Sequence, residues 1–248
     1  MATQKHLRHA PIVEAIVEFH VDGPHDASLG AGEKLYERIK GAYPIREKQV
    51  TGTFRLQLTA PDSIKAEAGK ALHSGFRFKS ADGNRVLNAG LSAFSFHRLK
   101  PYTRWEDLRD DARTLWQTYC EEFHPKAITR IGVRYVNNVS IPMTATNLSS
   151  YLVPGPIIPE GLPQSVQSFF SRVEIIDQSN ERVGIISQVS QGATGVGMFS
   201  VVLDLDVVKT GAFVASDDAI WIVVDKMRDF KNQLFFKSVT DLLLEQYE

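Results

Sequence analysis

Two arginines, Arg130 and Arg134, lie four residues apart in the stretch ITRIGVRYVNNV near the middle of the chain. Alternate residues of a strand point to the same face, so both guanidinium groups share one face with Gly132 between them. Arginine binds phosphate or carboxylate groups through paired N–H donors, and glycine leaves room for a close approach. The spacing therefore predicts a site for an anion or an acidic partner, or a row of structural ion pairs, and the two roles are compatible.

A second strand-like stretch, PIVEAIVEFHV near the start, offers opposite charges in matching places. When it is aligned without gaps on the first stretch, Glu14 falls on Arg130 and Glu18 falls on Arg134. We interpret the two stretches as neighbouring strands at the centre of one sheet, with the glutamates facing the arginines. Pairs of opposite charge on adjacent strands each contribute about 0.2–1 kcal/mol, which would favour this pairing and its register.

Further polar residues are expected on the same face by the alternation of the other strands. Arg55, in TGTFRLQLTA, and Arg77, in GFRFK, are predicted to border the ligand-binding or partner-binding surface formed by the four charges above. The alternation assigns six more side chains to this face: Gln57, His97, Asn138, Arg172, Asp204 and Asp206.

Other motifs that could carry chemistry favour structural interpretations. Asp204 and Asp206 could hold a divalent cation, but a hydrated strand face near the arginines is the preferred interpretation. His97 lacks an identifiable partner for acid–base catalysis, and the glycine-rich QGATGVG lacks the Lys-Ser/Thr of a phosphate-binding loop. Phe76 and Phe78 are interpreted as core residues rather than a platform for nucleobases. We therefore predict no catalytic residue, no metal ligand and no cofactor.

Composition limits the classes of partner. The net charge is −1, whereas a non-specific nucleic-acid binder usually carries a basic excess, so nucleic acid would require a local basic patch. The single cysteine, Cys120, excludes an internal disulfide and is read as a small core residue of a helix. No apolar run approaches the ~20 residues that span a bilayer, and we expect a cytoplasmic protein without membrane contact.

The order of the expected elements indicates an internal duplication. Helices are predicted at residues 33–44, at 101–123 with Thr103 as N-cap, at 146–153, and from 216 to the end with a break near Phe235 to Ser238. Each half then follows the order β-α-β-β-β-α, giving one compact domain of two pseudo-repeats, residues 1–126 and 127–248. The expected fold is a two-layer α+β protein, with a curved, mainly antiparallel sheet and helices on one face.

Four blocks carry a resemblance to a known family: APIVEAIVEF, PYTRWEDL, ITRIGVRYVNNVSIP and VVLDLDV. In this order they resemble a sporadically distributed bacterial TIGR-type family of similar length, with IGVRYVN as the most specific block. The resemblance implies a bacterial cytoplasmic protein without an assigned enzyme activity. Patchy occurrence is in turn associated with mobile or defence genes, such as toxin–antitoxin or anti-phage modules. By analogy of fold alone, the duplicated pattern is similar to the TATA-binding-protein saddle.

We therefore expect a non-enzymatic binding protein, a component of a bacterial defence or toxin–antitoxin-like module. Its polar sheet face would recognise a protein partner, such as the product of a neighbouring gene, or a second copy of the chain. Two alternatives remain open at this point: a sensor or hydrolase of a small phosphorylated ligand, and a specific nucleic-acid-binding protein.

Overall fold

The computed structural model describes residues 7–23, 30–51, 54–60, 63–68, 72–142, 148–194 and 197–248. The strands and helices follow in the order β1 (Ile12–Asp22), α1 (Gly30–Ile39), β2 (Ile45–Thr51), β3 (Phe54–Ala60), β4 (Ser63–Ala68), β5 (Leu72–Lys79), β6 (Arg85–Gly90), β7 (Ala93–Leu99), α2 (Trp105–Phe123), β8 (Ala127–Pro142), β9 (Phe170–Asp177), β10 (Arg182–Thr194), β11 (Met198–Phe213), α3 (Ala219–Ser238) and α4 (Asp241–Leu244). Short 3₁₀ turns lie at Leu148–Ser150, Gln178–Asn180 and Glu245–Tyr247.

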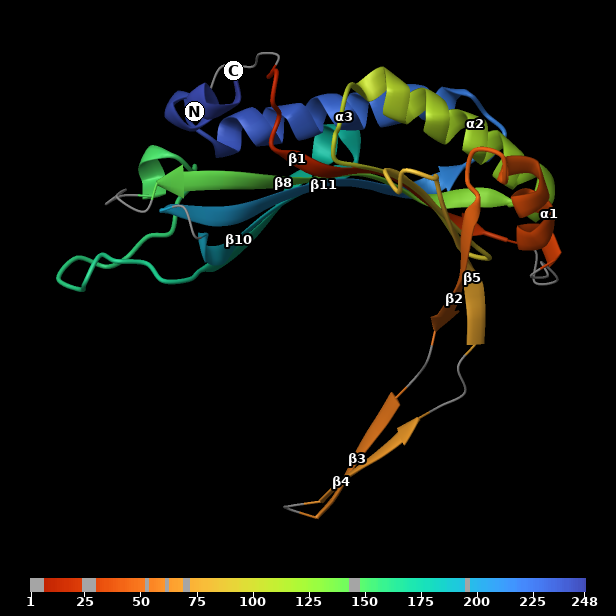
Figure 1. Cartoon of the computed structure of the whole chain (residues 1–248), viewed down its shortest axis with the longest axis horizontal. Coiled ribbons are helices and arrows are strands. Elements are labelled where there is room, and N and C mark those ends of the chain that lie inside the picture. Colours follow the sequence, from red (N-terminus) through yellow and green to blue (C-terminus); the bar gives the residue numbers. More distant parts are fainter. Residues whose placement is uncertain are drawn as a thin grey trace.

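A nine-stranded antiparallel sheet organises the molecule. Its strand order is β2-β5-β6-β7-β1-β8-β11-β10-β9, so β1 and β8 are neighbours near the centre, as the sequence predicts. Their register places Glu18 opposite Gly132 and Ile16 opposite Arg134. Figure 1 shows α1, α2 and α3 on one side of this sheet, with β2 and β5 curving away from the helices. This arrangement confirms the expected α+β class and the curved sheet.

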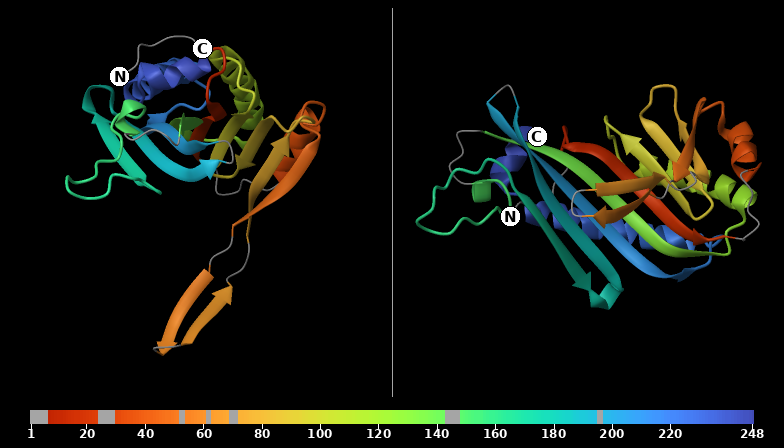
Figure 2. Two further views of the ribbon diagram at one scale, coloured as in Figure 1. Left: turned by 60° about the vertical axis from the view of Figure 1, so that its left-hand side comes forward. Right: turned by 90° about the horizontal axis from the view of Figure 1, so that it is seen from below.

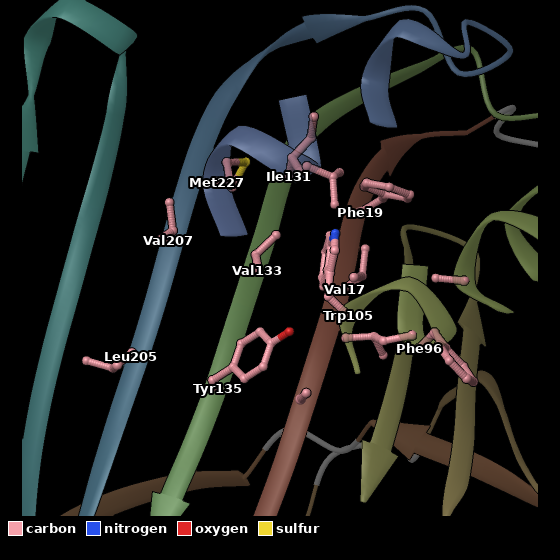
Figure 3. Packing of buried hydrophobic residues seen from close by; sticks show 14 of the residues in the cluster. Val17, Phe19, Phe96, Trp105, Ile131, Val133, Tyr135, Leu205, Val207 and Met227 are labelled. Carbon is pink, nitrogen blue, oxygen red and sulfur yellow. The ribbon is translucent and has the colours of Figure 1, made fainter. Parts of the chain in front are cut away.

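The hydrophobic core lies between the sheet and its helices. Val17 and Phe19 on β1, and Ile131, Val133 and Tyr135 on β8, are almost completely buried and point toward the helical layer (Figure 3). The two-residue alternation of both strands therefore predicts the buried face correctly. Burial of large apolar side chains contributes roughly 1.5–3 kcal/mol each, so these two strands add substantially to the stability of the sheet.

Aromatic contacts attach the helices to the central strands. The ring of Phe19 packs edge-on against Trp116 of α2 and Trp221 of α3, with centroids 4.7 and 5.7 Å away. The indole N–H of Trp116 also donates a hydrogen bond of 3.0 Å to the carbonyl oxygen of Ala215, just before α3. One residue of β1 therefore contacts the long helices of both halves, which fixes them over a common core.

The ends of the helices differ in detail from the sequence-based expectations. Thr103 does not cap α2, because the N-cap residue is Arg104 and the Thr103 hydroxyl bonds instead to the carboxylate of Asp107. The expected break in the last helix comes after Ser238, where Val239 adopts extended backbone before Thr240 caps α4. The cap differs because the Thr103 hydroxyl bonds to a side chain, which the spacing alone does not show, whereas the break after Ser238 agrees with the expected position.

The hairpin of β3 and β4 is separate from the nine-stranded sheet. Among the described residues these two strands pair with each other alone, and they lie well away from the helical layer in Figures 1 and 2. The stretch TGTFRLQLTA was predicted to form a strand of the main sheet; it does contain β3, but the placement in that sheet was wrong. In the part of the chain that the structure describes, no helix is long and apolar enough to cross a membrane.

Gly32 allows α1 to approach the sheet, and we expect Gly32→Ala to destabilise the fold. A Cβ atom at this position would collide with the ring of Phe76, which is itself stacked on Phe78 with centroids 5.8 Å apart. Alanine gains at most about 1 kcal/mol in helix propensity, whereas overpacking a core costs about 1–3 kcal/mol. Denaturant unfolding should show a net loss of stability. Gly41→Ala is the control, because a Cβ atom there meets nothing within 4 Å; equal effects would contradict this account.

Candidate functional site

We call the side of the nine-stranded sheet that carries no helix the open face (Figures 1 and 2). The strand register determines which side chains belong to it. Its polar residues include Glu47 on β2, Arg77 and Lys79 on β5, Asn88 on β6, Ser95 and His97 on β7, Glu14, Glu18 and His20 on β1, Arg130, Arg134 and Asn138 on β8, Asp204 and Asp206 on β11, Ser187 on β10, and Arg172 and Glu174 on β9.

Arg130 lies between carboxylates from the strands on both sides. Its guanidinium group donates to Glu18 Oε1 at 3.1 Å and to Asp206 Oδ2 at 3.5 Å. Glu18 also contacts the ring of His20. Burial raises the pKa of Asp206, and the positive charges of Arg130 and Arg134 offset this effect only in part. Arg130 is therefore already engaged by the protein's own acids.

Arg134 forms the most regular ion pair of the open face. Its Nε and Nη2 atoms donate to the two carboxylate oxygens of Asp204 at 2.8 and 2.6 Å. This two-point geometry is the strong form of an arginine–carboxylate contact. The hydrogen bonds to Asp204 raise the pKa of Arg134 further, so its guanidinium group stays charged at neutral pH.

The expectation that the glutamates of β1 face the arginines of β8 holds for one glutamate, Glu18, and neither pair given by the alignment, Glu14 with Arg130 or Glu18 with Arg134, forms an ion pair among the described contacts. Glu18 forms an ion pair with Arg130. Arg134 instead forms an ion pair with Asp204 on β11, and Glu14 contacts His97 on β7. The gapless alignment of β1 on β8 ignores that the strands run antiparallel, which puts Glu14 opposite Val136 and Glu18 opposite Gly132. Which carboxylate each arginine contacts therefore depends on diagonal neighbours across β1 and β8 and on β11, the other neighbour of β8.

Gly132 provides space on the open face, and the protein's own side chain fills it. A Cβ atom at Gly132 would lie 3.3 Å from Nη1 of Arg130 and 3.5 Å from the Cβ atom of Glu18. Any larger residue would therefore press on the Arg130–Glu18 pair. The sequence suggests that this glycine leaves room for a ligand. In the structure the guanidinium group of Arg130 occupies that room.

A chain of hydrogen bonds joins Glu14, His97 and Ser95. His97 Nδ1 is 2.7 Å from Glu14 Oε1, and His97 Nε2 is 2.8 Å from the Ser95 hydroxyl. The hydrogen bond with His97 lowers the pKa of Glu14, an effect supported by nearby positive charges and opposed by burial. The sequence interpretation found no partner for His97, because Glu14 is distant in the chain and reaches it only through the β1–β7 pairing.

This order of serine, histidine and carboxylate has the connectivity of a hydrolytic triad, but its surroundings do not suit acyl transfer. The Asn88 amide nitrogen donates to both Ser95 Oγ and His97 Nε2, at 3.0 and 2.8 Å, and so occupies the lone pairs that a reaction would need. Ser95 also lies inside β7, which is paired with β6 on one side and β1 on the other. The backbone N–H groups that would stabilise an oxyanion are therefore committed to the sheet.

Arg77 and Arg55, the other two predicted site residues, lie in different parts of the molecule. Arg77 is exposed on the open face, where its Nε donates to Asn88 Oδ1 at 2.9 Å. Arg55 lies on β3 in the separate hairpin, so it does not border Arg130 and Arg134 as expected. Phe76 and Phe78, which flank Arg77, are buried core residues, as predicted.

Charges on the open face are nearly balanced. Its arginines and lysine alternate with carboxylates across the strands, and the pairs extend to Lys79 with Glu47 and to Arg172 with Glu174, at 2.6 and 2.8 Å. Within the described ranges, no three His, Cys, Asp or Glu side chains are arranged to hold a metal ion. The open face therefore has the electrostatics of a neutral, internally paired surface rather than of an anion trap.

A cavity on the helix side of the sheet contains residues that the sequence analysis overlooked. It has a volume of about 820 Å³ and lies between residues 7–12, the start of α2, and α3. Its unusual member is Lys231, which is only 6 % exposed. One signal in the sequence could have found it: Lys231 follows Val224 and Met227 along the apolar stripe of α3, at helical spacing where another apolar residue is expected.

No family model matches the chain, and none of the curated protein sequences compared with it matches significantly.

Glu14 and Asp206 should affect acid stability in opposite directions. The pKa of Glu14 is lowered by folding, so its ionised form stabilises the protein at neutral pH, and this contribution disappears as the pH falls through the lowered pKa. Glu14→Gln should therefore flatten the loss of unfolding free energy below about pH 4.5. The pKa of Asp206 is raised, so Asp206→Asn should steepen that loss. Denaturant unfolding at stepped pH values measures both, and slopes that move together would refute the assignment.

Proposed function

We propose that this chain is a non-enzymatic interaction protein that recognises a protein partner across the open face. The observation that carries the proposal is the pairing of Arg130 and Arg134 with the protein's own carboxylates, on a wide surface that no helix covers. Paired charges of both signs suit a protein surface with a complementary pattern, because such patterns give specificity and orientation without requiring a highly charged partner.

The same pairing disfavours the two alternative functions at this surface. A phosphate group approaching Arg134 would have to displace Asp204 from a two-point ion pair, and Arg130 would have to leave both Glu18 and Asp206. Nucleic acid gains its affinity by neutralising phosphates with free cations, which the nearly balanced open face does not supply. A protein partner is therefore the occupant that this face supports best.

The strand order supports the proposed duplication of residues 1–126 and 127–248. Moving outward from the central pair, β1 is followed by β7, β6 and β5, and β8 is followed by β11, β10 and β9. The sheet strands of each half are followed by a long helix, α2 or α3. We propose on this basis a twofold pseudo-repeat with a saddle-like sheet. The second half departs from it: where the first half has α1, the described residues between β8 and β9 form a 3₁₀ turn, Leu148–Ser150.

The resemblance of four sequence blocks to a sporadically distributed bacterial family suggests where to find the partner. We propose that the protein acts in the cytoplasm as part of a defence or toxin–antitoxin-like module, and that a neighbouring gene encodes the partner. The search for a partner can therefore begin with the products of the adjacent genes.

A charge swap separates recognition from folding. Arg134→Asp and Asp204→Arg should each reduce the unfolding free energy by about 1 kcal/mol or less, because Arg134 is half-exposed, and the double swap should restore most of it. Partner binding should remain lost in the double swap, since the partner meets reversed charges. Binding is measured by co-purification with the co-expressed neighbouring gene products, followed by calorimetry with the protein recovered.

The matched control is the Arg113–Asp218 ion pair on the helix side of the molecule, at 2.6 Å. Swapping these two residues should leave partner binding unchanged. Unchanged binding in the Arg134/Asp204 swap, or an equal loss in both swaps, would show that the open face is not the recognition surface.

A further inference from the structure

The helix-side cavity combines an apolar wall with several cationic groups. Its volume of about 820 Å³ is in the range of sites for small organic molecules. Trp105, Phe235 and Phe236 line it together with two tyrosines, Tyr102 and Tyr135. The cavity therefore offers aromatic and apolar surface for the body of a ligand, on the side of the sheet opposite to the open face.

Cations predominate in the lining of this cavity. Four of its residues are positively charged, namely Arg8, Arg104, Arg228 and Lys231, whereas Glu106 is the acidic residue among them. Arg228 contacts Asp229 at 3.0 Å and Arg104 contacts Asp107 at 2.8 Å, but these two carboxylates do not line the cavity. An anion in the cavity could therefore approach these cationic groups from a side that Asp107 and Asp229 do not occupy.

Among these cationic groups, Lys231 is the one that is buried and has no ion pair among the described residues. Its ammonium group lies 3.7 Å from the centroid of the Tyr135 ring and donates to Asn232 Oδ1 at 2.6 Å. Among the described residues, no carboxylate lies within ion-pair distance of it. Burial is accordingly the main cause that lowers the pKa of Lys231 to about 7, and nearby Arg228 adds to the effect. A buried cation without a counterion is costly to maintain, so a lysine at this position favours the binding of an anion.

Hydroxyl groups complete the polar end of the cavity. The hydroxyl oxygens of Tyr102 and Tyr135 are 2.9 Å apart, so one donates to the other and one proton remains for a further acceptor. Tyr135 lies directly beneath the Lys231 ammonium group. A ligand oxygen near Lys231 could therefore receive both an ionic contact and a neutral hydrogen bond.

We propose that this cavity binds a small organic phosphate. Its phosphate group would pair with Lys231 and Arg228, and its apolar body would rest against Trp105 and Phe235. A phosphate has more acceptor oxygens than a carboxylate, so it suits a volume where Lys231 has no carboxylate partner and the guanidinium group of Arg228 lies nearby. The protein would then sense a metabolite on its helix side while a protein partner occupies the open face.

Binding of phenyl phosphate and of adenosine 5′-monophosphate, measured by calorimetry and by thermal shift, tests the proposal. Both probes carry an aromatic body and a phosphate, and at least one should bind. Phenol and adenosine lack the phosphate and should bind roughly tenfold more weakly or not at all. Binding of neither phosphate probe, or equal binding of the uncharged analogues, would overturn the proposal.

Lys231→Met identifies the group responsible. Methionine fills a similar volume without charge, so the free protein should be at least as stable as the wild type while affinity for the phosphate probe falls roughly tenfold or more. Lys237→Met, on an exposed position of the same helix, is the control and should leave binding unchanged. Gain of stability with loss of binding distinguishes a site residue from a structural one. Full binding by Lys231→Met would refute the assignment.

The pH dependence gives an independent check. The groups that face Lys231 are Arg228 and Asp229 of α3, Arg104 and Glu106 at the start of α2, Tyr102 and Tyr135, and Arg8. The folded-state pKa of Lys231 is lowered, so between about pH 7 and the ordinary lysine value near 10.5 the unfolded chain binds more protons and stability rises with pH. Affinity for the probe should fall over the same interval as Lys231 loses its proton. Both trends should vanish in Lys231→Met, and their persistence would contradict the site.

The edge strand β9 carries a second, independent inference. At the opposite edge, β2 presents the charged run Arg46, Glu47 and Lys48, a common protection against unwanted strand pairing. β9 instead exposes large apolar side chains, with Phe170 and Ile176 about two-thirds or more accessible. Among the described residues, its strand partner is β10 alone.

We infer that β9 pairs with β9 of a second copy of this chain. An antiparallel pairing centred on Val173 places Arg172 of one copy opposite Glu174 of the other, and Phe170 opposite Ile176, twice by symmetry. Both charges and both apolar side chains lie on the open face of their own sheet. This self-complementary register favours a second copy over an unrelated strand, and it would extend the open face across two molecules.

Sedimentation analysis of three proteins tests this pairing. The wild type should dimerise, and Val173→Lys should be monomeric because two ammonium groups would meet at the symmetry axis. Ile222→Lys, at an exposed apolar position on α3, should remain dimeric. Mixing Val173→Lys with Val173→Glu should restore a dimer of unlike chains. A monomeric wild type, or a dimer that survives Val173→Lys, would overturn the inference.

Discussion

The antiparallel pairing of β1 with β8 is the contact on which the rest of the structure depends. It joins the first and second halves of the chain, which are separated by more than a hundred residues, and it gives each strand one apolar and one polar face. Phe19 and Val133 face the helices, and Glu18 and Arg130 face away from them. A shift of one residue in this register would exchange the two faces of a strand, so core packing and surface chemistry are determined together.

The open face and the helix side of the sheet differ in how their charged side chains are compensated. On the open face, each central arginine forms an ion pair with a carboxylate from a neighbouring strand, and the remaining glutamate, Glu14, forms a hydrogen bond with His97. On the helix side, Lys231 is buried against Tyr135 without such a carboxylate among the described residues. The first arrangement is stable as it stands and suits a surface for recognition, whereas the second leaves a charge that a ligand would satisfy.

Much of the secondary structure could be predicted, because strand alternation and the apolar stripes of α2 and α3 are local properties. The neighbourhood of β1 and β8 could also be inferred, since two similar amphipathic strands suggested a common place in the sheet. The individual ion pairs could not be predicted. Whether Arg134 contacts Glu14 or Asp204 depends on the antiparallel register of β1 and β8 and on the position of β11. The same holds for Arg55, whose strand alternates like the others but belongs to a separate hairpin.

The sequence by itself determined the α+β class, the two faces of the central strands and the residue types available for recognition, because these follow from short-range periodicity. Only the tertiary structure decided which charges are already satisfied: Arg130 and Arg134 by neighbouring strands, and Lys231 by little more than an aromatic ring and an amide. Whether a charged side chain is free to bind depends on its distance from opposite charges and on its burial. Both are set by contacts between residues remote in the chain, which a linear pattern does not contain.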